Sequence, residues 1–342
     1  MAITIRDVAK AAKVSETAVS AVMGRPGRCC TVRVGESTRR RIVAAAKRLA
    51  YSPNIVASGL RTGKTFTVGV ILEATGVEVH MRKSQALEDM AYANGYRLFV
   101  CHHRFELERM EAYIRDLLAR RVDGLIVDPI FTAKCNTLRR LAESHFPLVF
   151  FPGGPSFEAD RAQVDNVHGG YLGARHMIEI GRTRMAFFYG RTFYPSIQGR
   201  LNGWRIACEE AGLDFEGMTF METSETPYPD TAYQMCRSLM SSGHAIDAVV
   251  ATNDLLALGV LKAMQDTGIN VPGNVAVMGF DDNHFSGFLP IPLTTIRQPA
   301  KELGEAAFRL LLRRMEDPGA PFETVSLKPS LVVRQSTMVA KK

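Results

Sequence analysis

Polar side chains that could bind a small molecule follow several short apolar runs of this chain. Asp128, Asn253 and Asp281 each come just after such a run, and Arg200 lies in segment 199–204. Carboxylate, amide and guanidinium groups offer hydrogen-bond acceptors and donors in fixed directions, as neighbouring hydroxyl groups of a ligand require. An Asn or Asp at such a position can instead cap the helix that follows. From the residues alone, both roles stay open.

Two further patterns resemble chemical sites only in part. Segment 59–65 resembles a phosphate-binding loop, but its first Gly would fall at Ser58 and no strand is expected before it. His102 and His103 have no second pair at metal-ligand spacing, so we expect them to form a surface pair at a strand end. The sequence has no nucleophile elbow, zincin signature or matched acid–base pair. We therefore expect no enzyme, metal or cofactor.

The elements that must position these side chains are expected from residue 66 onward, as strands alternating with amphipathic helices. Short continuous apolar runs suit parallel strands that are covered on both faces. The candidate strands are 67–72, 97–101, 124–127, 148–151, 184–189, 218–222, 248–251 and 275–280. These two consecutive sets predict two doubly wound parallel-sheet lobes. Ligands of such folds bind beyond the carboxyl ends of the strands, where the polar residues fall.

The first 23 residues predict two short helices joined by a tight turn. Thr4 and Asp7 form a capping signature for the first helix, and Ser15 is a good N-cap for the second. The predicted apolar faces carry Val8, Ala9 and Ala12, then Val19, Val22 and Met23. The opposite face of the second helix carries Glu16, Thr17, Ser20 and Ala21. This pattern suits a helix-turn-helix that enters a DNA major groove, although an ordinary helical hairpin shares it.

Two more helices are expected before the body. One starts at Ser37, and its apolar face carries Ile42, Val43, Ala46 and Leu49. The other follows Ser52, with Pro53 at its first position, and it would have only about two turns. Such a short helix is marginal alone in water, so we expect it to order on docking.

The positive charge of the chain is concentrated at its beginning. The formal net charge is +7, but residues 1–64 hold 13 Lys and Arg against 3 Asp and Glu, a net of +10. Residues 65–342 hold 29 against 32, a net of −3. A basic head on a slightly acidic body is typical of a phosphate-binding module joined to a part with another task. A membrane-surface anchor would share this sign, but no lipidation signal or amphipathic aromatic face accompanies it.

The remaining composition favours a cytoplasmic protein. No apolar run approaches the length of a membrane span, and Met1 leads directly into a charged helix rather than a signal peptide. The six cysteines show no metal-binding or disulfide-framework spacing, so we expect reduced thiols. The adjacent pair Cys29 and Cys30 is unusual, but a vicinal disulfide would be strained.

The segments TIRDVAKAAKVSETAVSAVMGRPG and STRRRIVAAAKRLAYSPNIVASGLRTGKT together resemble the head of the lactose-repressor/galactose-repressor (LacI/GalR) family of bacterial transcription regulators. The resemblance continues through nearly the whole chain. It implies that the helix after Pro53 is a hinge helix, that two copies pack together on DNA, and that Leu60 wedges into the minor groove. Asn54 and Ala57 would lie on its docking face. It also implies a periplasmic-binding-protein architecture for the two lobes.

Site residues are carried over by motif position. Arg200, Asn253 and Asp281 match effector contacts of the family, and Ser196 and Gln298 match more loosely. Glu73, Tyr228 and Phe193 are added as candidates for the cleft wall, together with Asp128. Among the expected DNA contacts, Thr17 is the favoured base contact and Ser20 the favoured phosphate contact. The other expected DNA contacts are Thr4, Ser15, Glu16 and Ala21.

The chain also departs from the family pattern. Lys13 stands where a turn Gly or Asn is common, and Ala21 where many members have a long polar base reader. Residues 29–33 are the expected insertion in a lengthened linker. Where members often carry Asp-Arg after the fourth strand, this chain has Pro152 and Gly153, so the ligand need not be a typical hexose.

We therefore predict a repressor that binds operator DNA as a homodimer and responds to a small-molecule effector, a sugar or sugar derivative, between its lobes. The predicted units are a head at 1–51, a hinge and linker at 52–65, and a body at 66–336. Lobe one would comprise 66–165 and 298–323, and lobe two 166–297 and 324–336. A solute-binding protein would instead need an export signal and no basic head, and an enzyme on this scaffold would need a catalytic constellation. A purely architectural DNA binder would not need the body. Whether the effector is an inducer or a corepressor stays open.

Overall fold

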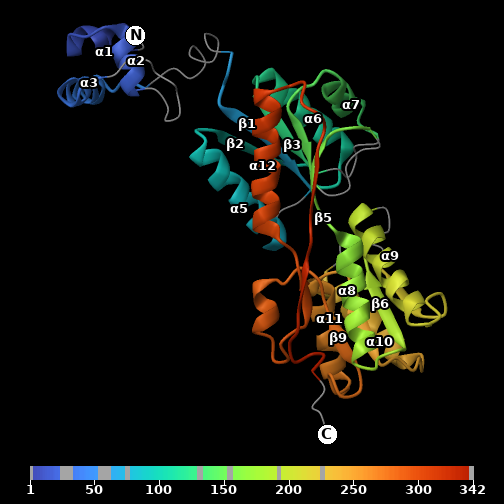
Figure 1. Cartoon of the computed structure of the whole chain (residues 1–342). Coiled ribbons are helices and arrows are strands. Elements are labelled where there is room, and N and C mark those ends of the chain that lie inside the picture. Colours follow the sequence, from blue (N-terminus) through green and yellow to red (C-terminus); the bar gives the residue numbers. More distant parts are fainter. Residues whose placement is uncertain are drawn as a thin grey trace.

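The computed structural model describes residues 3–23, 34–52, 63–73, 78–128, 134–151, 157–190, 194–223 and 228–338. Three helices form the head: α1 (Ile5–Ala12), α2 (Glu16–Met23) and α3 (Glu36–Arg48). Val8, Val19 and Ile42, one from each helix, are fully buried in a shared core. Figure 1 shows these helices as a small unit at the N-terminal end of the molecule.

The helix caps that the sequence predicts for the head are present in the structure. The backbone N–H and the hydroxyl of Thr4 both donate to Asp7 Oδ2, at 2.8 and 2.7 Å, and these bonds lower the pKa of Asp7. Ser15 Oγ accepts from Ala18 N at 3.1 Å and caps α2. Lys13 has φ = 52°, the left-handed conformation for which Gly or Asn is the easier residue.

One predicted core residue of the head is wrong. Val43 is 48% exposed, and Ala45 is buried instead. Arg41 links α3 to the end of α1, because its Nη2 donates to the carbonyl of Ala12 at 2.6 Å. This bond satisfies a carbonyl that the helix itself leaves unpaired.

Lobe one is built on a six-stranded parallel sheet of order β11-β5-β4-β3-β1-β2. Its strands are β1 (Thr67–Leu72), β2 (Arg97–His102), β3 (Gly124–Val127), β4 (Leu148–Phe150), β5 (Asp160–Val164) and β11 (Thr324–Leu327). Two helices, α5 (Glu78–Ala93) and α12 (Ala300–Glu316), pack on one face of the sheet. The other face is covered by α6 (Leu107–Ala119) and α7 (Asn136–Glu143).

Lobe two repeats this arrangement around a four-stranded parallel sheet of order β7-β6-β8-β9. Its strands are β6 (Met185–Tyr189), β7 (Thr219–Glu222), β8 (Ala248–Ala251) and β9 (Ala276–Met278). One face is covered by α8 (Asn166–Glu179) and α9 (Pro195–Glu210), the other by α10 (Pro229–Ser241) and α11 (Asp254–Asp266). A short 3-10 helix, η1 (His284–Gly287), follows β9.

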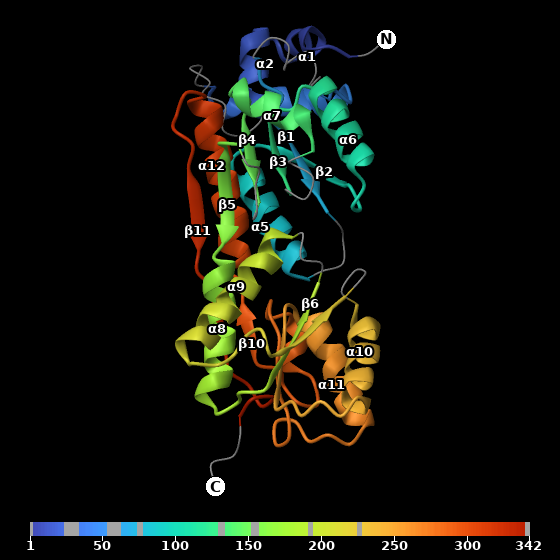
Figure 2. The ribbon, with the colours of Figure 1, turned by 90° about the vertical axis from the view of Figure 1, so that its right-hand side faces the viewer.

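Three crossings of the chain join the lobes, and Figures 1 and 2 show them lying side by side between the two sheets. The first leads from β5 into α8, and the second from β10 (Thr295–Arg297) into α12. The third leads from β11 to β12 (Ser330–Val332), which pairs antiparallel with β10. Thr324–Leu327 pairs with β5, so these residues belong to lobe one, whereas the sequence placed them in lobe two.

The strands that the sequence missed are β5, β10, β11 and β12. In β5, buried and half-buried residues alternate, and Asp160 and Arg161 give it a polar appearance. Asp160 is nevertheless fully buried, because Arg314 Nε and Arg313 Nη2 donate to its carboxylate at 2.8 and 3.0 Å. No helix among the described residues is long and apolar enough to cross a membrane.

Candidate functional site

Arg200 is the centre of the lobe-two half of the site. It is buried on α9, where its Nε donates to Asn166 Oδ1 at 3.0 Å and its Nη1 to the carbonyl of Thr252. Its guanidinium lies over the ring of Phe280, 3.6 Å from the centroid. Burial lowers the pKa of Arg200 to about 10, with Asp281 and Asp254 opposing the shift, so the group stays charged at neutral pH.

The close packing of α8 against α9 sets the position of Arg200. A Cβ at Gly170 would overlap the backbone of Arg200, and a Cβ at Gly203 would overlap the carbonyl of Val167. Glycine at these two positions therefore lets the helices approach closely. Ser196 lies one turn before Arg200 on α9, so the two side chains share a helix face.

Asp281 follows β9 and is also buried. Its Oδ1 accepts from Gln298 Nε2 at 2.6 Å, which joins the end of the lobe-two sheet to the second crossing. Burial raises the pKa of Asp281 to about 6, although the nearby Arg200 opposes the shift. Its φ of 119° is one that L-residues rarely adopt, so the carboxylate is held in place at a cost in backbone strain.

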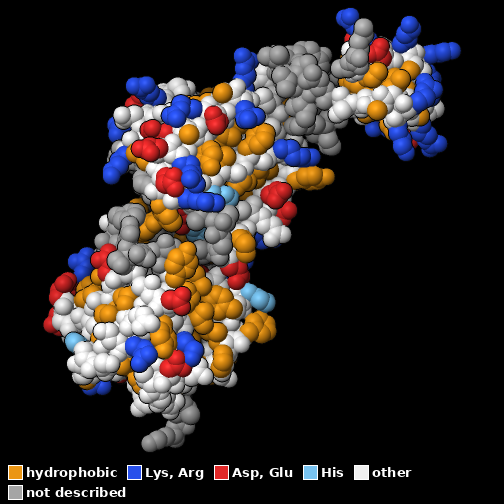
Figure 3. All heavy atoms as spheres, turned by 180° about the vertical axis from the view of Figure 1, so that it is seen from behind, with side chains coloured by type: hydrophobic (Ala, Val, Ile, Leu, Met, Phe, Trp, Pro, Cys, Tyr) orange, Lys and Arg blue, Asp and Glu red, His pale blue; other side chains and the backbone are white. Residues whose placement is uncertain are grey.

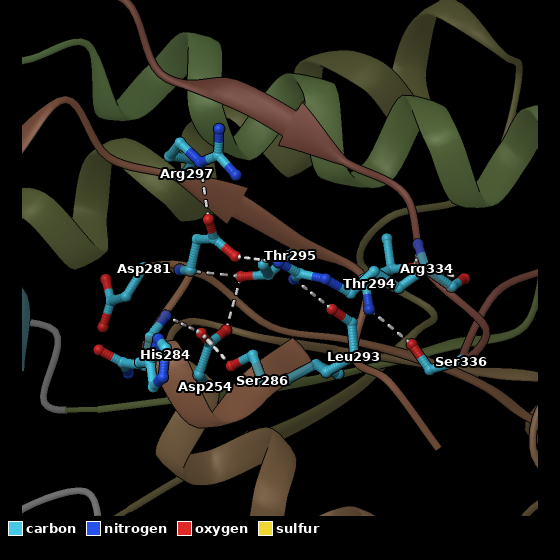
Figure 4. Close-up of polar contacts among 12 residues, drawn as sticks. Asp254, Asp281, His284, Ser286, Leu293, Thr294, Thr295, Arg297, Arg334 and Ser336 are labelled. Carbon is cyan, nitrogen blue, oxygen red and sulfur yellow. Dashed lines mark hydrogen bonds and ion pairs between the residues drawn. The ribbon is translucent and has the colours of Figure 1, made fainter. Parts of the chain in front are cut away.

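Asp254 anchors the loop that carries Asp281. Asn283 N, Ser286 Oγ and Thr295 Oγ1 donate to its carboxylate at 2.8, 2.7 and 2.6 Å. Burial raises the pKa of Asp254 to about 7 despite these bonds. Figure 4 shows Asp254 beneath the crossing strands, with Ser286 and Thr295 converging on it.

Asp282 extends the same network to β10 and to the segment after β12. Its Oδ2 accepts from Arg297 Nε and its Oδ1 from Arg334 Nη2, both at 2.6 Å. Burial alone would raise the pKa of Asp282, but these bonds and the two positive charges hold it below its ordinary value. The first Arg lies at the end of β10 and the second just after β12. The loop after β9 is thus fixed to β10, which leads into the second crossing, and to the segment that follows β12 (Figure 4).

The lobe-one half of the site combines strand ends with helix α5. Lys83 Nζ lies 3.7 Å from Asp128 Oδ2 and 3.9 Å from the centroid of the Phe151 ring. His80 Nε2 lies 3.8 Å from Glu73 Oε1. Burial raises the pKa of Glu73 to about 8 and lowers that of His80 to about 4, so both are uncharged at pH 7.

Direct contacts join the two halves. Arg82 Nη2, from α5, donates to the carbonyls of Asp281 and Asp282 at 3.1 and 2.8 Å. His284 N, from lobe two, donates to Glu78 Oε2 at 2.6 Å. The structure therefore brings residues from both lobes to one place.

The structure brings some of the predicted effector residues together and leaves others apart. Glu73, Asp128, Arg200, Asp281 and Gln298 lie in the groups described above. Asn253 Oδ1 accepts from Leu256 N at 2.8 Å, so this side chain caps α11, the alternative role that its position allows. Tyr228 is 58% exposed at the start of α10, and the described contacts do not connect it to the other predicted residues. Phe193 lies outside the described residues.

Sequence reasoning missed Lys83, His80 and Arg82. All three lie on α5, and a Lys or Arg on a helix is usually a solvated surface residue, so composition gave no signal. The expectation of a surface histidine pair is wrong for His103. Its side chain is fully buried, and its Nδ1 accepts from Phe105 N at 3.2 Å.

The predicted DNA-reading face belongs to α2. Glu16 and Thr17 are exposed, and Ser20 and Ala21 are half-buried. Arg6 Nε lies 3.2 Å from Glu16 Oε1, so α1 and α2 share an ion pair at this face. Blue side chains ring the head in Figure 3, and those on α3 include the exposed Arg39, Arg40, Arg41, Lys47 and Arg48. Asn54, Ala57, Leu60 and the Cys29–Cys30 pair lie outside the described residues.

Comparisons with known proteins agree with this arrangement. Residues 4–54 match the family of bacterial regulatory proteins, lacI family, and residues 174–337 match a periplasmic binding protein-like domain. The chain is 31% identical over 336 residues to the HTH-type transcriptional repressor PurR of Mannheimia succiniciproducens, covering 97% of this chain and 98% of that protein. It is 32% identical over 343 residues to the PurR repressor of Aliivibrio fischeri, covering 98% of each.

Solved structures share the fold along the whole chain. The crystal structure of the lac repressor dimer bound to operator and the anti-inducer ONPF superposes with a TM-score of 0.85 at 25% identity, covering 99% of this chain and 100% of that one. A complex of the transcriptional regulator CelR with cellobiose gives a TM-score of 0.72 at 25% identity, covering 98% and 99%. The head and both lobes thus match as one arrangement.

Proposed function

Because the chain belongs to the lacI family of bacterial regulatory proteins, it is a DNA-binding transcription regulator, and we propose that a small molecule bound between its lobes controls its affinity for an operator. The chain acts as a repressor in the cytoplasm and pairs as a homodimer on near-palindromic DNA. The effector is a sugar or sugar derivative. Arg200 and Asp281 contact it from lobe two, Gln298 contacts it from the second crossing, and Glu73 and Asp128 contact it from lobe one.

The observation that carries this proposal is the meeting of buried polar groups from both lobes on a chain that also has a helix-turn-helix head. Among the described residues, the buried atoms without a hydrogen-bond partner include His80 Nδ1, Thr252 Oγ1 and Asn283 Oδ1. His80 lies on α5 with Lys83, the carbonyl of Thr252 accepts from Arg200, and Asn283 is two residues after Asp281. An unsatisfied buried polar atom costs about 1–3 kcal/mol, so a ligand that supplies partners here is favoured.

The homodimer is supported by apolar side chains on the surface of lobe one. Met81 and Tyr92 on α5, and Phe99 and Val100 on the edge strand β2, are all exposed. Large exposed apolar groups of this kind mark association surfaces. Pairing two chains through lobe one would bring two heads to one side, as a two-fold symmetric operator requires.

The effector controls the head through the lobes. A ligand that contacts residues on both lobes binds one of their relative poses more tightly than another, and this difference is a coupling free energy between the cleft and the DNA. An inducer favours the pose that separates the heads, and a corepressor the pose that brings them together. The affinity for operator DNA falls with an inducer and rises with a corepressor, so measuring it with and without the ligand distinguishes the two.

The test combines operator selection with a ligand screen. Purified protein is used to select duplexes from a random DNA library, which should yield near-palindromic sites. A thermal-shift panel of sugars, polyols, sugar phosphates, nucleosides and purines then finds ligands that stabilise the folded chain. We expect a ligand that raises the melting temperature also to change the affinity for the selected operator in fluorescence anisotropy. A tight ligand with no effect on DNA binding would contradict the proposal.

A further inference from the structure

Among the described residues of the site, Lys83 of lobe one and Arg200 of lobe two are buried cations, and each has a carboxylate nearby. Lys83 and Asp128 form an ion pair with a closest distance of 3.7 Å, and their side chains are 7% and 11% exposed. Arg200 and Asp281 interact electrostatically, since each opposes the shift that burial causes in the pKa of the other. The two pairs come from opposite lobes, and each is formally neutral.

The Lys83–Asp128 pair has unused hydrogen-bonding capacity. Within the described part of the chain, no hydrogen bond reaches the ammonium of Lys83 or the carboxylate of Asp128. An ammonium has three donors and a carboxylate two acceptor oxygens. A buried ion pair is stable only when such groups find partners, so this pair is arranged to receive a ligand.

Several neighbouring charges are paired or suppressed: Arg82 lies 3.6 Å from Glu78, and Asp282 accepts from Arg297 and Arg334. Glu73 and His80 are uncharged at pH 7, because burial raises the pKa of the first to about 8 and lowers that of the second to about 4. Asp254, whose pKa is raised to about 7, already accepts three hydrogen bonds.

We propose that the effector is an uncharged molecule with neighbouring hydroxyl groups, and that the Lys83–Asp128 pair excludes its acidic, phosphorylated and cationic derivatives. This inference rests on the proposed function. A hydroxyl can accept from the ammonium and donate to the carboxylate, so it satisfies both groups without adding charge. A carboxylate, phosphate or ammonium on the ligand would bring one unbalanced charge into a buried, charge-paired site, which costs binding free energy.

The experiment uses matched sets of ligands that differ in charge at one position. Each set holds a neutral aldose or polyol, the corresponding aldonic or uronic acid, its phosphate and its amino derivative. Thermal shift finds the sets that bind the full-length protein, and isothermal titration measures each member. We expect the neutral member to bind at least about tenfold more tightly than any charged member of its set. Tighter binding of an acid or phosphate would overturn the inference.

Two variants test whether the pair itself sets this preference. Asp128→Asn leaves Lys83 without its counter-charge, so the ratio of acid to neutral affinity should rise about tenfold. Lys83→Met leaves Asp128 unpaired, so the ratio of amine to neutral affinity should rise instead. Equal weakening of all members by both variants would show a merely structural role and overturn the inference. If either variant fails to fold, as judged by circular dichroism, the wild-type ratios decide.

The two levels of the proposal fail differently. An acidic ligand that binds and changes operator affinity would overturn the charge preference and leave the proposed function standing. If no member of the panel binds, the result would contradict both effector control and the charge preference.

Discussion

Arg82 of lobe one donates from Nη2 to the backbone carbonyl of Asp282 of lobe two at 2.8 Å. The same nitrogen reaches the carbonyl of Asp281 at 3.1 Å, so one guanidinium holds the loop that carries a predicted effector carboxylate. Glu78 lies one turn earlier on α5, where it accepts from His284 N and pairs with Arg82 at 3.6 Å. The start of α5 is therefore tied to the loop after β9 by side chains of one lobe and backbone groups of the other.

Removing this tie should loosen the lobes. We expect Arg82→Ala to broaden the distribution of interlobe distances in single-molecule fluorescence transfer and to increase the radius of gyration in small-angle scattering. Hydrogen bonds to a charged group contribute about 1.5–3 kcal/mol each, enough to shift a two-state equilibrium by about tenfold or more. Arg109→Ala is the control, because that side chain pairs with Glu106 at 3.1 Å within lobe one. Equal distributions for both variants would mean that the tie does not set the pose.

The effector response should depend on the charge of Asp281. Asn has nearly the same shape and still accepts the bond from Gln298, so Asp281→Asn removes the charge. We expect the effector found in the thermal-shift panel to bind at least about tenfold more weakly, with the fold and the dimer unchanged. Titration calorimetry measures the affinity, and Glu209→Gln on the exposed side of α9 is the control. A normal effector response in the Asp281→Asn protein would place the site elsewhere.

Stability should depend on pH through Glu73. Its pKa is about 8 in the folded chain, against an ordinary value of 4.5. Between these values the unfolded chain ionises this group and the folded chain does not, so rising pH lowers the free energy of unfolding until about pH 8. Glu73→Gln mimics the protonated acid and does not titrate.

Urea unfolding of both proteins from pH 5 to 9 checks this sign. We expect the variant to gain stability relative to the wild type from pH 5 to 8 and the difference to level off above about pH 8.5. Glu209→Gln removes an exposed carboxylate and measures the effect of one lost charge as such. A constant difference between Glu73→Gln and the wild type across this range would mean that Glu73 is ionised in the folded protein.

The sequence predicted the parts of the fold that rest on continuous apolar runs. β1, β3 and β8 have the predicted bounds, because strands covered on both faces are apolar throughout. β5 was missed because its buried Asp160 is polar in the sequence and is compensated by Arg313 and Arg314 from α12, far along the chain. β11 belongs to lobe one because it pairs with β5, and the local sequence does not show this pairing.

The sequence predicted those residues of the candidate site that lie just after strands. Asp128 stands directly after β3 and Asp281 shortly after β9, so their place at the carboxyl edges of the sheets followed from topology. Lys83 was not predictable, because its burial depends on Asp128 and Phe151, which are brought to α5 only by the tertiary fold. A buried cation is recognised by its partners, and a single sequence does not pair them.

Leu60 lies outside the described residues and is assigned to the minor groove by motif position alone. An apolar wedge unstacks one base step and bends the duplex, so it contributes only where the DNA can be bent at the operator centre. Leu60→Ala should therefore weaken binding to the selected operator by at least about tenfold while changing non-specific binding little. Anisotropy titrations against the operator and a scrambled duplex, at one fixed salt concentration, measure both losses. Leu49→Ala, a half-buried residue of the head core, controls for general destabilisation of the head and should weaken binding to both duplexes alike. If Leu60→Ala also weakened binding to both duplexes alike, Leu60 would not be the residue that wedges into the minor groove.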